Sequence, residues 1–286
     1  MTNRRHILQA LNTKIAAGKA VIGAGAGIGL SAKCAEVAGL DFIVIYNSGR
    51  YRMAGRSSMA GLMPYGDANA IVVEMANETL PAVTRIPVVA GVCGTDPFRL
   101  MPPFLRQLRD MGCAGVQNYP TVCLFEGTIR ANLEETGLGF DREVEMIAQA
   151  RELDLLTVAY VAGEAEARAM AAAGADILVP HMGLTTAGMT GAKTSIGLEE
   201  AVEAIDRLGK VGKETNPDCI VMCHGGPISG PEDLAYVLSH SEYAQGFLGA
   251  SSMERLPTER AMVEHMARFT EFTFDQQQVA DERHKP

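Results

Sequence analysis

Two histidines stand where apolar, strand-like segments end. His181 follows Ile177–Pro180, and His224 ends the segment Ile220–His224. An imidazole changes charge near neutral pH, so a histidine at the end of a strand can transfer a proton during a reaction. A histidine in this position can also be a structural residue that only makes hydrogen bonds. We predict that His181 and His224 are catalytic, with the structural role as the alternative for each.

Two carboxylates stand in comparable positions. Asp96 comes soon after the strand-like segment Val88–Val92, and Glu126 lies in the long segment Thr121–Phe140. Mg²⁺ needs only one or two protein carboxylates when substrate oxygens complete its coordination. We therefore predict that Asp96 and Glu126 are catalytic and hold Mg²⁺. The alternatives are that Asp96 caps the following helix and that Glu126 is only an exposed residue.

Glycines and serines follow the last two strand-like segments, in His224-Gly225-Gly226-Pro227 and Gly249-Ala250-Ser251-Ser252. Unobstructed backbone N–H groups, hydroxyls and the start of a helix together bind phosphate or carboxylate. The alternative is that the glycines only permit the turns. We predict that five of these residues bind one end of a small anionic substrate: Gly225, Gly226, Gly249, Ser251 and Ser252.

The segment after the second strand-like run carries three arginines, although the protein as a whole is acidic. It reads Asn47-Ser48-Gly49-Arg50-Tyr51-Arg52-Met53-Ala54-Gly55-Arg56. A guanidinium binds a carboxylate or phosphate with two hydrogen bonds. Arg52 and Arg56 can equally be surface residues, whereas Arg50 is nearest the end of the strand. We predict that four residues bind the other end of the substrate: Asn47, Ser48, Gly49 and Arg50.

The glycine tract Gly23–Gly29 contains a Gly-x-Gly-x-x-Ala pattern typical of dinucleotide-binding folds. Such a fold has an acidic residue at the end of its second strand, where this chain has Asn47. The alternative is that the glycines permit tight turns or let the backbone pass close to a ligand. We favour this alternative.

These residues are distributed over eight repeats of a strand-like segment followed by a helical pattern. The strand-like segments are Ala20–Gly23, Phe42–Tyr46, Val88–Val92, Gly115–Asn118, Leu156–Tyr160, Ile177–Pro180, Ile220–His224 and Phe247–Ala250. Connections from helix to strand are short, whereas the loops after strands two, four and six are long. In a closed barrel the reactive groups lie on the loops that follow the strands. We predict an α/β fold, a (β/α)8 TIM barrel.

We expect one domain over residues 1–286, with an additional helix within 1–19 and a loose tail at 276–286. Residues Asn47–Asp67 are expected to form a loop, and the last helix to run from Pro257 to Phe272. A (β/α)8 barrel of this length is common for a single domain.

Composition excludes several classes of function. The net charge of −9 disfavours general binding to nucleic acid or an anionic membrane. No apolar run approaches the ~18 residues of a membrane-spanning helix, and the N-terminus lacks the apolar core of a signal peptide. The six cysteines include no Cys-x-x-Cys pair. We expect a cytoplasmic protein with reduced thiols that binds neither nucleic acid nor membrane.

Five segments carry a resemblance to a known family that extends over nearly the whole chain. They are Gly23–Gly29, Tyr46–Arg50, Gln117–Thr121, His224–Pro227 and Gly246–Arg255. The chain resembles the phosphoenolpyruvate hydrolase-like family of TIM-barrel proteins, which are also described as phosphonopyruvate hydrolases. The resemblance implies membership of the phosphoenolpyruvate/pyruvate superfamily, whose enzymes make or break bonds next to a pyruvate enolate held on Mg²⁺.

The resemblance also has implications for single residues and for assembly. Tyr46–Gly49 is similar to the loop that receives the substrate carboxylate, and Asp96 to a metal-holding acid. The family's second acid and its Lys-Lys-Cys-Gly-type loop have no counterpart, since Cys93, Gly94 and Thr95 precede Asp96. Many proteins of the superfamily associate through outer helices, so the resemblance implies a homo-oligomer.

Three functions are compatible with these residues. The first is hydrolysis of phosphoenolpyruvate or phosphonopyruvate to pyruvate and phosphate through a Mg²⁺-stabilised enolate. The second is carbon–carbon bond cleavage or aldol chemistry on a 2-oxo acid. The third is a ligand-sensing barrel without catalysis. We favour the first.

Overall fold

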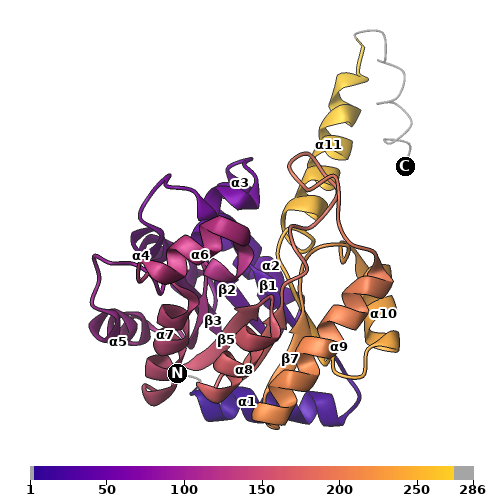
Figure 1. Cartoon of the computed structure of the whole chain (residues 1–286). Helices are drawn as coiled ribbons and strands as arrows, with labels where there is room; N and C mark the ends of the chain where they lie inside the picture. The colour runs from indigo at the N-terminus through magenta and orange to yellow at the C-terminus, as the bar shows by residue number, and fades with distance from the viewer. Residues whose placement is uncertain (1–2, 274–286) are drawn as a thin grey trace.

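The computed structural model describes residues 3–273. Eight parallel strands form a closed barrel in chain order, in which β8 pairs with β1 (Figure 1). The strands are β1 (Val21–Gly25), β2 (Phe42–Ile45), β3 (Val88–Val92), β4 (Gly115–Asn118), β5 (Leu156–Val161), β6 (Ile177–Pro180), β7 (Ile220–Cys223) and β8 (Gly246–Gly249). The predicted (β/α)8 TIM barrel is confirmed.

Helices surround the barrel and lie across its two ends (Figure 1). They are α1 (Arg4–Ala16), α2 (Gly29–Val37), α3 (Asn47–Met53), α4 (Ala68–Thr79), α5 (Met101–Met111), α6 (Gly127–Glu135), α7 (Phe140–Glu152), α8 (Glu164–Ala172), α9 (Leu198–Thr215), α10 (Pro231–His240) and α11 (Arg255–Thr270). Three short 3-10 helices are η1 (Ser58–Leu62), η2 (Leu80–Ala82) and η3 (Val122–Leu124).

The strands are apolar runs because they are buried on both faces. Every residue of β2 to β8 is buried. One face of each strand packs on the outer helices and the other fills the barrel, so alternation of apolar and polar residues is weak. This pattern made the strand positions visible in the sequence.

The amino-terminal ends of the strands are closed by α1. Ile7 and Leu11 are buried. Arg4 Nε donates to Asp176 Oδ2 at 2.8 Å, just before β6. The predicted additional helix within residues 1–19 is therefore a cap on the end of the barrel opposite the predicted reactive groups.

Two segments expected to be loops contain helices instead. Asn47–Asp67 contains α3 and η1, and the long segment after β4 contains η3 and α6. These helices are short, and α6 has no buried residue, so their sequences lack the apolar periodicity that predicts a helix. In Figure 1, α3 and α6 lie at the end of the barrel opposite α1.

The last helix leaves the barrel. It begins close to the predicted position, but α11 projects away from the other helices (Figure 1). Four apolar residues on it are exposed, namely Met262, Val263, Met266 and Phe269. The predicted tail at 276–286 lies outside the described residues. No helix in the described part of the chain is long and apolar enough to cross a membrane.

Candidate active site

A chamber of about 320 Å³ lies at the carboxyl-terminal ends of the strands. Its walls come from β5 and from the segments that follow β2, β4, β6, β7 and β8, so the barrel collects residues that are far apart in the sequence. The polar residues that line it are Tyr46, Ser48, Arg52, Ser58, Tyr119, Tyr160, His181, Thr185, Thr194, His224 and Ser251.

Both predicted catalytic histidines line this chamber. The centroids of their rings are 4.6 Å apart, because His181 and His224 face each other across a backbone bridge between the ends of β6 and β7. Nδ1 of His224 lies 2.5 Å from the Leu248 carbonyl oxygen and must donate to it. Nδ1 of His181 accepts from the N–H of Gly183 at 3.0 Å. The two rings therefore hold opposite tautomers: His224 has its lone pair at Nε2, which faces the Tyr160 hydroxyl, and His181 has a proton there.

The chamber keeps both rings neutral. Burial lowers the pKa of His224 to about 4. Burial, and then the neighbouring His224 ring, hold the pKa of His181 well below its ordinary value. A neutral pair with one Nε2 acceptor and one Nε2–H donor can accept a proton at one point and donate a hydrogen bond at another.

Tyr160 connects the pair to the rest of the chamber. Its hydroxyl lies 3.3 Å from Nε2 of His224, and its ring is 4.9 Å from that of His181, centroid to centroid. Burial raises the pKa of Tyr160 well above its ordinary value, so the phenol keeps its proton and donates toward His224. Tyr160 stands on β5, on the strand next to His181.

One buried ion pair ties together three loops of the chamber. Arg52 and Glu254 are 0 % and 2 % exposed, and Arg52 Nη2 donates to Glu254 Oε2 at 2.7 Å. The other oxygen of Glu254 accepts from the N–H of Gly27 at 2.6 Å. The pair thus links the loop after β1, helix α3 and the segment after β8. It is also the one ion pair at the chamber wall among the described residues.

The glycine tract Gly23–Gly29 lets the loop after β1 pack closely against α3. A Cβ on Gly27 would lie 2.1 Å from the carbonyl oxygen of Gly49, so only glycine permits the contact between the loop after β1 and α3. The N–H of Gly27 bonds to Glu254. The favoured reading of the tract, close approach of the backbone, agrees with these contacts.

Serine hydroxyls line another part of the wall. Ser48 Oγ lies 2.5 Å from the Tyr119 hydroxyl, and Ser58 Oγ lies 3.4 Å from Ser251 Oγ. Of the substrate-binding residues predicted from sequence, Ser48 and Ser251 are thus brought to the chamber.

Arg50 is not brought there, and Arg52 takes its place. Asn47–Met53 is helical, so Ser48 and Arg52, four residues apart, share the face toward the chamber. Arg50 points the other way and pairs with Glu78 at 3.0 Å. Arg50 was chosen because it is nearest the end of the strand, but helix α3 turns its side chain away from the chamber. Gly49 is buried against Gly27 rather than in the chamber.

The predicted anion cradle after β7 and β8 is also largely occupied by the protein itself. The N–H of Gly226 donates to the Gly183 carbonyl at 2.9 Å. A Cβ on Gly225 would lie 2.3 Å from that same oxygen, and one on Gly249 would lie 2.3 Å from Met253. These glycines permit tight packing, and they do not line the chamber. Ser252 has a buried hydroxyl without a hydrogen-bond partner, but it does not line the chamber either.

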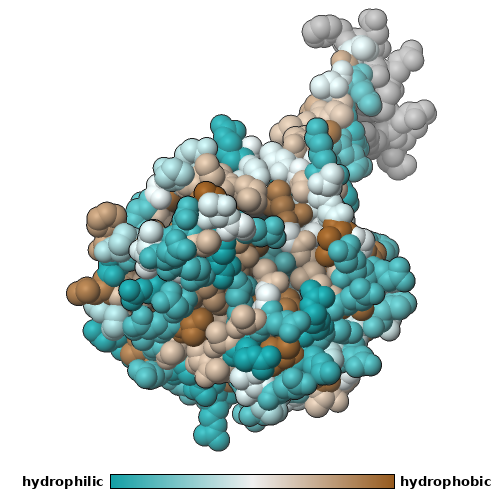
Figure 2. Space-filling view, viewed as in Figure 1, coloured by the Kyte–Doolittle hydropathy of each residue, from teal (hydrophilic) through white to brown (hydrophobic). Residues whose placement is uncertain are grey.

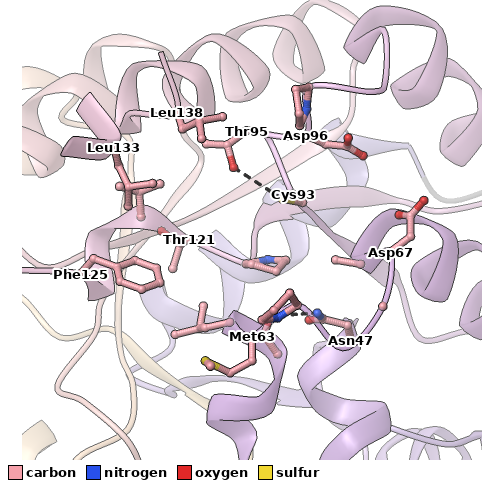
Figure 3. Close-up of a pocket in the computed structure, with 18 of the residues that line it drawn as sticks. Asn47, Met63, Asp67, Cys93, Thr95, Asp96, Thr121, Phe125, Leu133 and Leu138 are labelled. Carbon is pink, nitrogen blue, oxygen red and sulfur yellow. Dashed lines mark hydrogen bonds between the residues drawn. The ribbon is translucent and has the colours of Figure 1, made fainter. Parts of the chain in front are cut away.

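A second cavity of about 550 Å³ lies outside the barrel, between the loops after β2, β3 and β4 (Figure 3). We call it the outer cavity. It is lined by Asn47, Asp67 and Asp96 together with apolar side chains such as Phe125 and Leu133. In Figure 3 the two aspartates lie on one side and these apolar side chains on the other. Asn47 donates from Nδ2 to the Gly61 carbonyl at 2.9 Å, so it holds the loop.

The residues predicted to hold Mg²⁺ do not fit a metal site. Asp96 Oδ2 accepts from Asn69 at 2.9 Å and from Arg99 at 3.1 Å, and its Oδ1 accepts from the N–H of Phe98 at 2.9 Å. Glu126 is exposed and lines neither cavity. Within residues 3–273, no three His, Cys, Asp or Glu side chains are grouped to hold a metal ion. We derive no catalytic step through Mg²⁺.

Sequence reasoning missed three residues of the site. Tyr160 was taken as part of an apolar strand, Arg52 as an equal candidate for the surface, and Glu254 only as part of a family motif. A carboxylate and an arginine about two hundred positions apart give no local signal of pairing. A tyrosine at the carboxyl end of a barrel strand could have been noticed, because such positions face the reactive end.

Fold and site together define a TIM-barrel protein with acid–base side chains at the carboxyl ends of its strands. A tomato (Solanum lycopersicum) protein, ToMV susceptible protein tm-1(GCR26), is 60% identical over 256 residues, which are 90% of this chain and 34% of that protein. The chain therefore spans about a third of the length of that relative.

Solved structures share the fold at low identity. A phosphoenolpyruvate phosphomutase from Streptomyces platensis subsp. rosaceus has a TM-score of 0.59 at 18% identity, covering 98% of this chain and 91% of that one. A phosphonopyruvate hydrolase in complex with oxalate and Mg²⁺ has a TM-score of 0.55 at 16% identity, covering 96% and 90%. The family model described as phosphoenolpyruvate hydrolase-like matches residues 6–272. The chain belongs to this family, as its sequence resemblance predicted.

Proposed function

We propose that the protein is an enzyme that hydrolyses a small phospho- or phosphono-carboxylate, such as phosphoenolpyruvate or phosphonopyruvate, to pyruvate and phosphate. The observation that carries the proposal is the neutral pair His181 and His224 with opposite tautomers in one chamber. Hydrolysis needs a base for water and a hydrogen-bond donor to the leaving group, and the pair supplies both. Family membership and the named neighbours support this substrate class.

Each residue has a role in this proposal. His224 accepts a proton from water at Nε2, as the water oxygen bonds to phosphorus and the bond from phosphorus to the pyruvate moiety breaks. His181 keeps its Nε2 proton and donates a hydrogen bond to the departing enolate, and the proton that His224 has taken up passes to the enol oxygen or carbon, which returns His224 to its neutral form. Arg52 contributes positive charge at the wall, although Glu254 neutralises much of it. The chamber volume of about 320 Å³ suits a substrate of this size.

Incubation of the purified protein with phosphoenolpyruvate and with phosphonopyruvate tests the proposal. We expect pyruvate and phosphate in equal amounts from at least one of them, and loss of this activity in His224→Asn. Tight binding without turnover would point to a ligand-sensing barrel instead. No turnover with either compound would refute the hydrolase.

One observation favours a second candidate, carbon–carbon bond cleavage of a 2-oxo acid. The N–H of Gly226 is bonded to Gly183 and is not available to a phosphate. A substrate with two carboxylates would need no phosphate cradle. Pyruvate or another 2-oxo acid formed without phosphate, from a panel of such acids, would identify the lyase.

The predicted Mg²⁺ cofactor is carried by resemblance alone, since a neighbour is named in complex with it. Asp96 and Glu126 do not converge, so the assay is run with added Mg²⁺ and with a chelator. The cytoplasmic location stays a prediction.

We also propose a homo-oligomer. Apolar side chains lie among polar ones along the projecting helix α11 (Figure 2), and Met266 and Phe269 on it are 56% and 65% exposed. A second copy would cover such a face. Light scattering should give a mass above 30.5 kDa for the protein and a lower mass for Met266→Glu. A monomeric wild-type protein would refute the oligomer.

A further inference from the structure

The two adjacent amide side chains on β4, Gln117 and Asn118, differ in their hydrogen bonds. Asn118 Oδ1 accepts from the N–H of Tyr160 at 2.7 Å, and its Nδ2 donates to Glu143 at 2.7 Å and to the Tyr160 carbonyl at 3.1 Å. Gln117 is equally buried, with 0 % exposure, yet neither its Oε1 nor its Nε2 has a hydrogen-bond partner. Buried amides in proteins are very rarely left unpaired, because an unpaired one is unfavourable.

Gln117 points into the barrel. Side chains alternate along a strand, so Gln117 and Tyr119 point to one side and Asn118 to the other. Asn118 reaches Glu143 on the outer helix α7, and Tyr119 lines the chamber. Gln117 therefore points into the barrel one layer deeper than Tyr119, below the residues that line the chamber.

The residues paired with Gln117 on the neighbouring strands offer its amide no hydrogen-bond partner. The residues in register with it are Gly91 on β3 and Val158 on β5, and neither has a polar side chain. The amide is near enough to the Tyr160 hydroxyl to lower the pKa of that phenol, against the larger opposite effect of burial. It nevertheless makes no hydrogen bond that meets normal geometry. The Tyr160 hydroxyl can meet at most one of the two polar atoms of this amide, so the other requires a partner from outside the chain.

We propose that Gln117, just below the inner end of the chamber, is a ligand-binding residue whose Nε2–H donates to an oxygen of a bound carboxylate or enolate. Donors outnumber acceptors there. No carboxylate is among the described residues that line the chamber, whereas Arg52 is. A site with hydrogen-bond donors, a positive charge and no carboxylate selects a negatively charged oxygen of a ligand. The inference rests on the chamber of the proposed function but requires no particular reaction.

The test separates an amide that binds a ligand from an amide that stabilises the fold, because the two should change melting temperature in opposite directions when removed. In Gln117→Met the side chain keeps its length and loses its polar atoms. If the amide serves a ligand, the ligand-free variant should melt a few degrees higher, because an unpaired buried amide has been removed. Its affinity for oxalate, a small dicarboxylate, should fall roughly tenfold by calorimetric titration, as expected for a lost hydrogen bond to a charged group.

Asn118→Leu is the matched control on the same strand. It removes an amide whose hydrogen bonds are satisfied inside the protein, so its melting temperature should fall. Gln117→Glu serves as a second variant. It keeps the shape of the side chain but places a carboxylate next to the ligand, so oxalate binding should weaken further.

Three results would overturn the inference: a lower melting temperature in Gln117→Met, unchanged oxalate affinity in both Gln117 variants, or no oxalate binding by the wild-type protein. The proposed function fails separately. If oxalate binding depends on Gln117 while no substrate is turned over, the ligand site stands and the hydrolase does not. If substrate is hydrolysed with unchanged KM and kcat in Gln117→Met, the hydrolase stands and this inference does not.

Discussion

The chamber inside the barrel and the outer cavity differ in the chemistry that they offer, although they share a wall. Ser48 and Tyr119 line the chamber, and their chain neighbours Asn47 and Pro120 line the outer cavity. The chamber contains the neutral histidines and no carboxylate side chain among its described lining residues. The outer cavity is larger and contains Asp67 and Asp96.

The comparison teaches that acids near a barrel mouth are not by themselves a catalytic site. Asp67 and Asp96 both bond to Arg99, Asp67 Oδ2 at 2.6 Å and Asp96 Oδ2 at 3.1 Å. Asp67 also caps α4 through the N–H of Ala70. Their charges organise the loops after β2 and β3. In the chamber, by contrast, His181 and His224 have Nε2 atoms that the backbone does not use.

The strongest expected effect is on catalysis. His224→Asn removes the Nε2 acceptor, and kcat should fall by about 10²- to 10⁴-fold, as is usual for loss of a general base. Steady-state kinetics on the hydrolysed substrate measures this. His6→Asn, on the exposed surface of α1, is a matched control and should keep full activity. Equal activity of His224→Asn and the wild type would contradict the assignment of catalysis to the chamber rather than to the outer cavity.

The next effect is on stability. Glu254→Gln leaves the fully buried Arg52 without its counter-charge, so the free energy of unfolding should fall by about 3–5 kcal/mol. Asp67→Asn weakens a half-exposed ion pair of the outer cavity and should cost at most about 1 kcal/mol. Urea denaturation of both variants makes the comparison. Similar losses in the two variants would contradict it.

Stability should also depend on pH through Glu143, which is buried behind the chamber. Burial is the largest cause and raises the pKa of Glu143 to about 8, from an ordinary value of 4.5. The folded protein thus holds a proton that the unfolded chain releases. The free energy of unfolding should decrease as the pH rises from about 4.5 to about 8. Denaturation of the wild type and of Glu143→Gln at several pH values measures this. A slope that persists in the variant would assign it to another group.

His224 should act in the opposite direction at lower pH. Its pKa is lowered from 6.5 to about 4 in the folded protein, so the unfolded chain binds the proton more readily between these values. Its contribution to stability is present above pH 6.5 and is lost as the pH falls to about 4. The kcat/KM of the free enzyme should fall near the same lower pH, if His224 is the base. A kinetic pKa near 6.5 would show that the chamber does not hold the ring neutral.

The smallest expected effects belong to the predicted metal acids. Asp96→Asn and Glu126→Gln should change kcat/KM by no more than about twofold, since neither side chain lines the chamber. Kinetics at several Mg²⁺ concentrations measures this. A large rise in the Mg²⁺ requirement of Asp96→Asn would place catalysis in the outer cavity after all.

Eight repeats of an apolar strand followed by a helix, with short connections from helix to strand, were sufficient to predict the closed barrel. β3, β4 and β6 begin and end where the sequence placed them. His181 and His224 were found for the same reason, because the residue after a barrel strand must lie at its reactive end. Local sequence predicts a feature when that feature depends on a single strand or helix, as the strand positions and the residues at strand ends do.

The rest depended on contacts between distant segments. Arg52 rather than Arg50 reaches the chamber because α3 is a helix, and its apolar pattern is too short to reveal that. Glu254 became part of the site only when the closed barrel brought the segment after β8 against α3. Gln117 and Asn118 look alike in the sequence, and only the closed barrel decides which amide bonds to the protein and which points into the barrel without a partner. The sequence by itself determined the barrel and its reactive end; the tertiary structure decided which polar groups are paired, because pairing depends on distances between residues that no local pattern encodes.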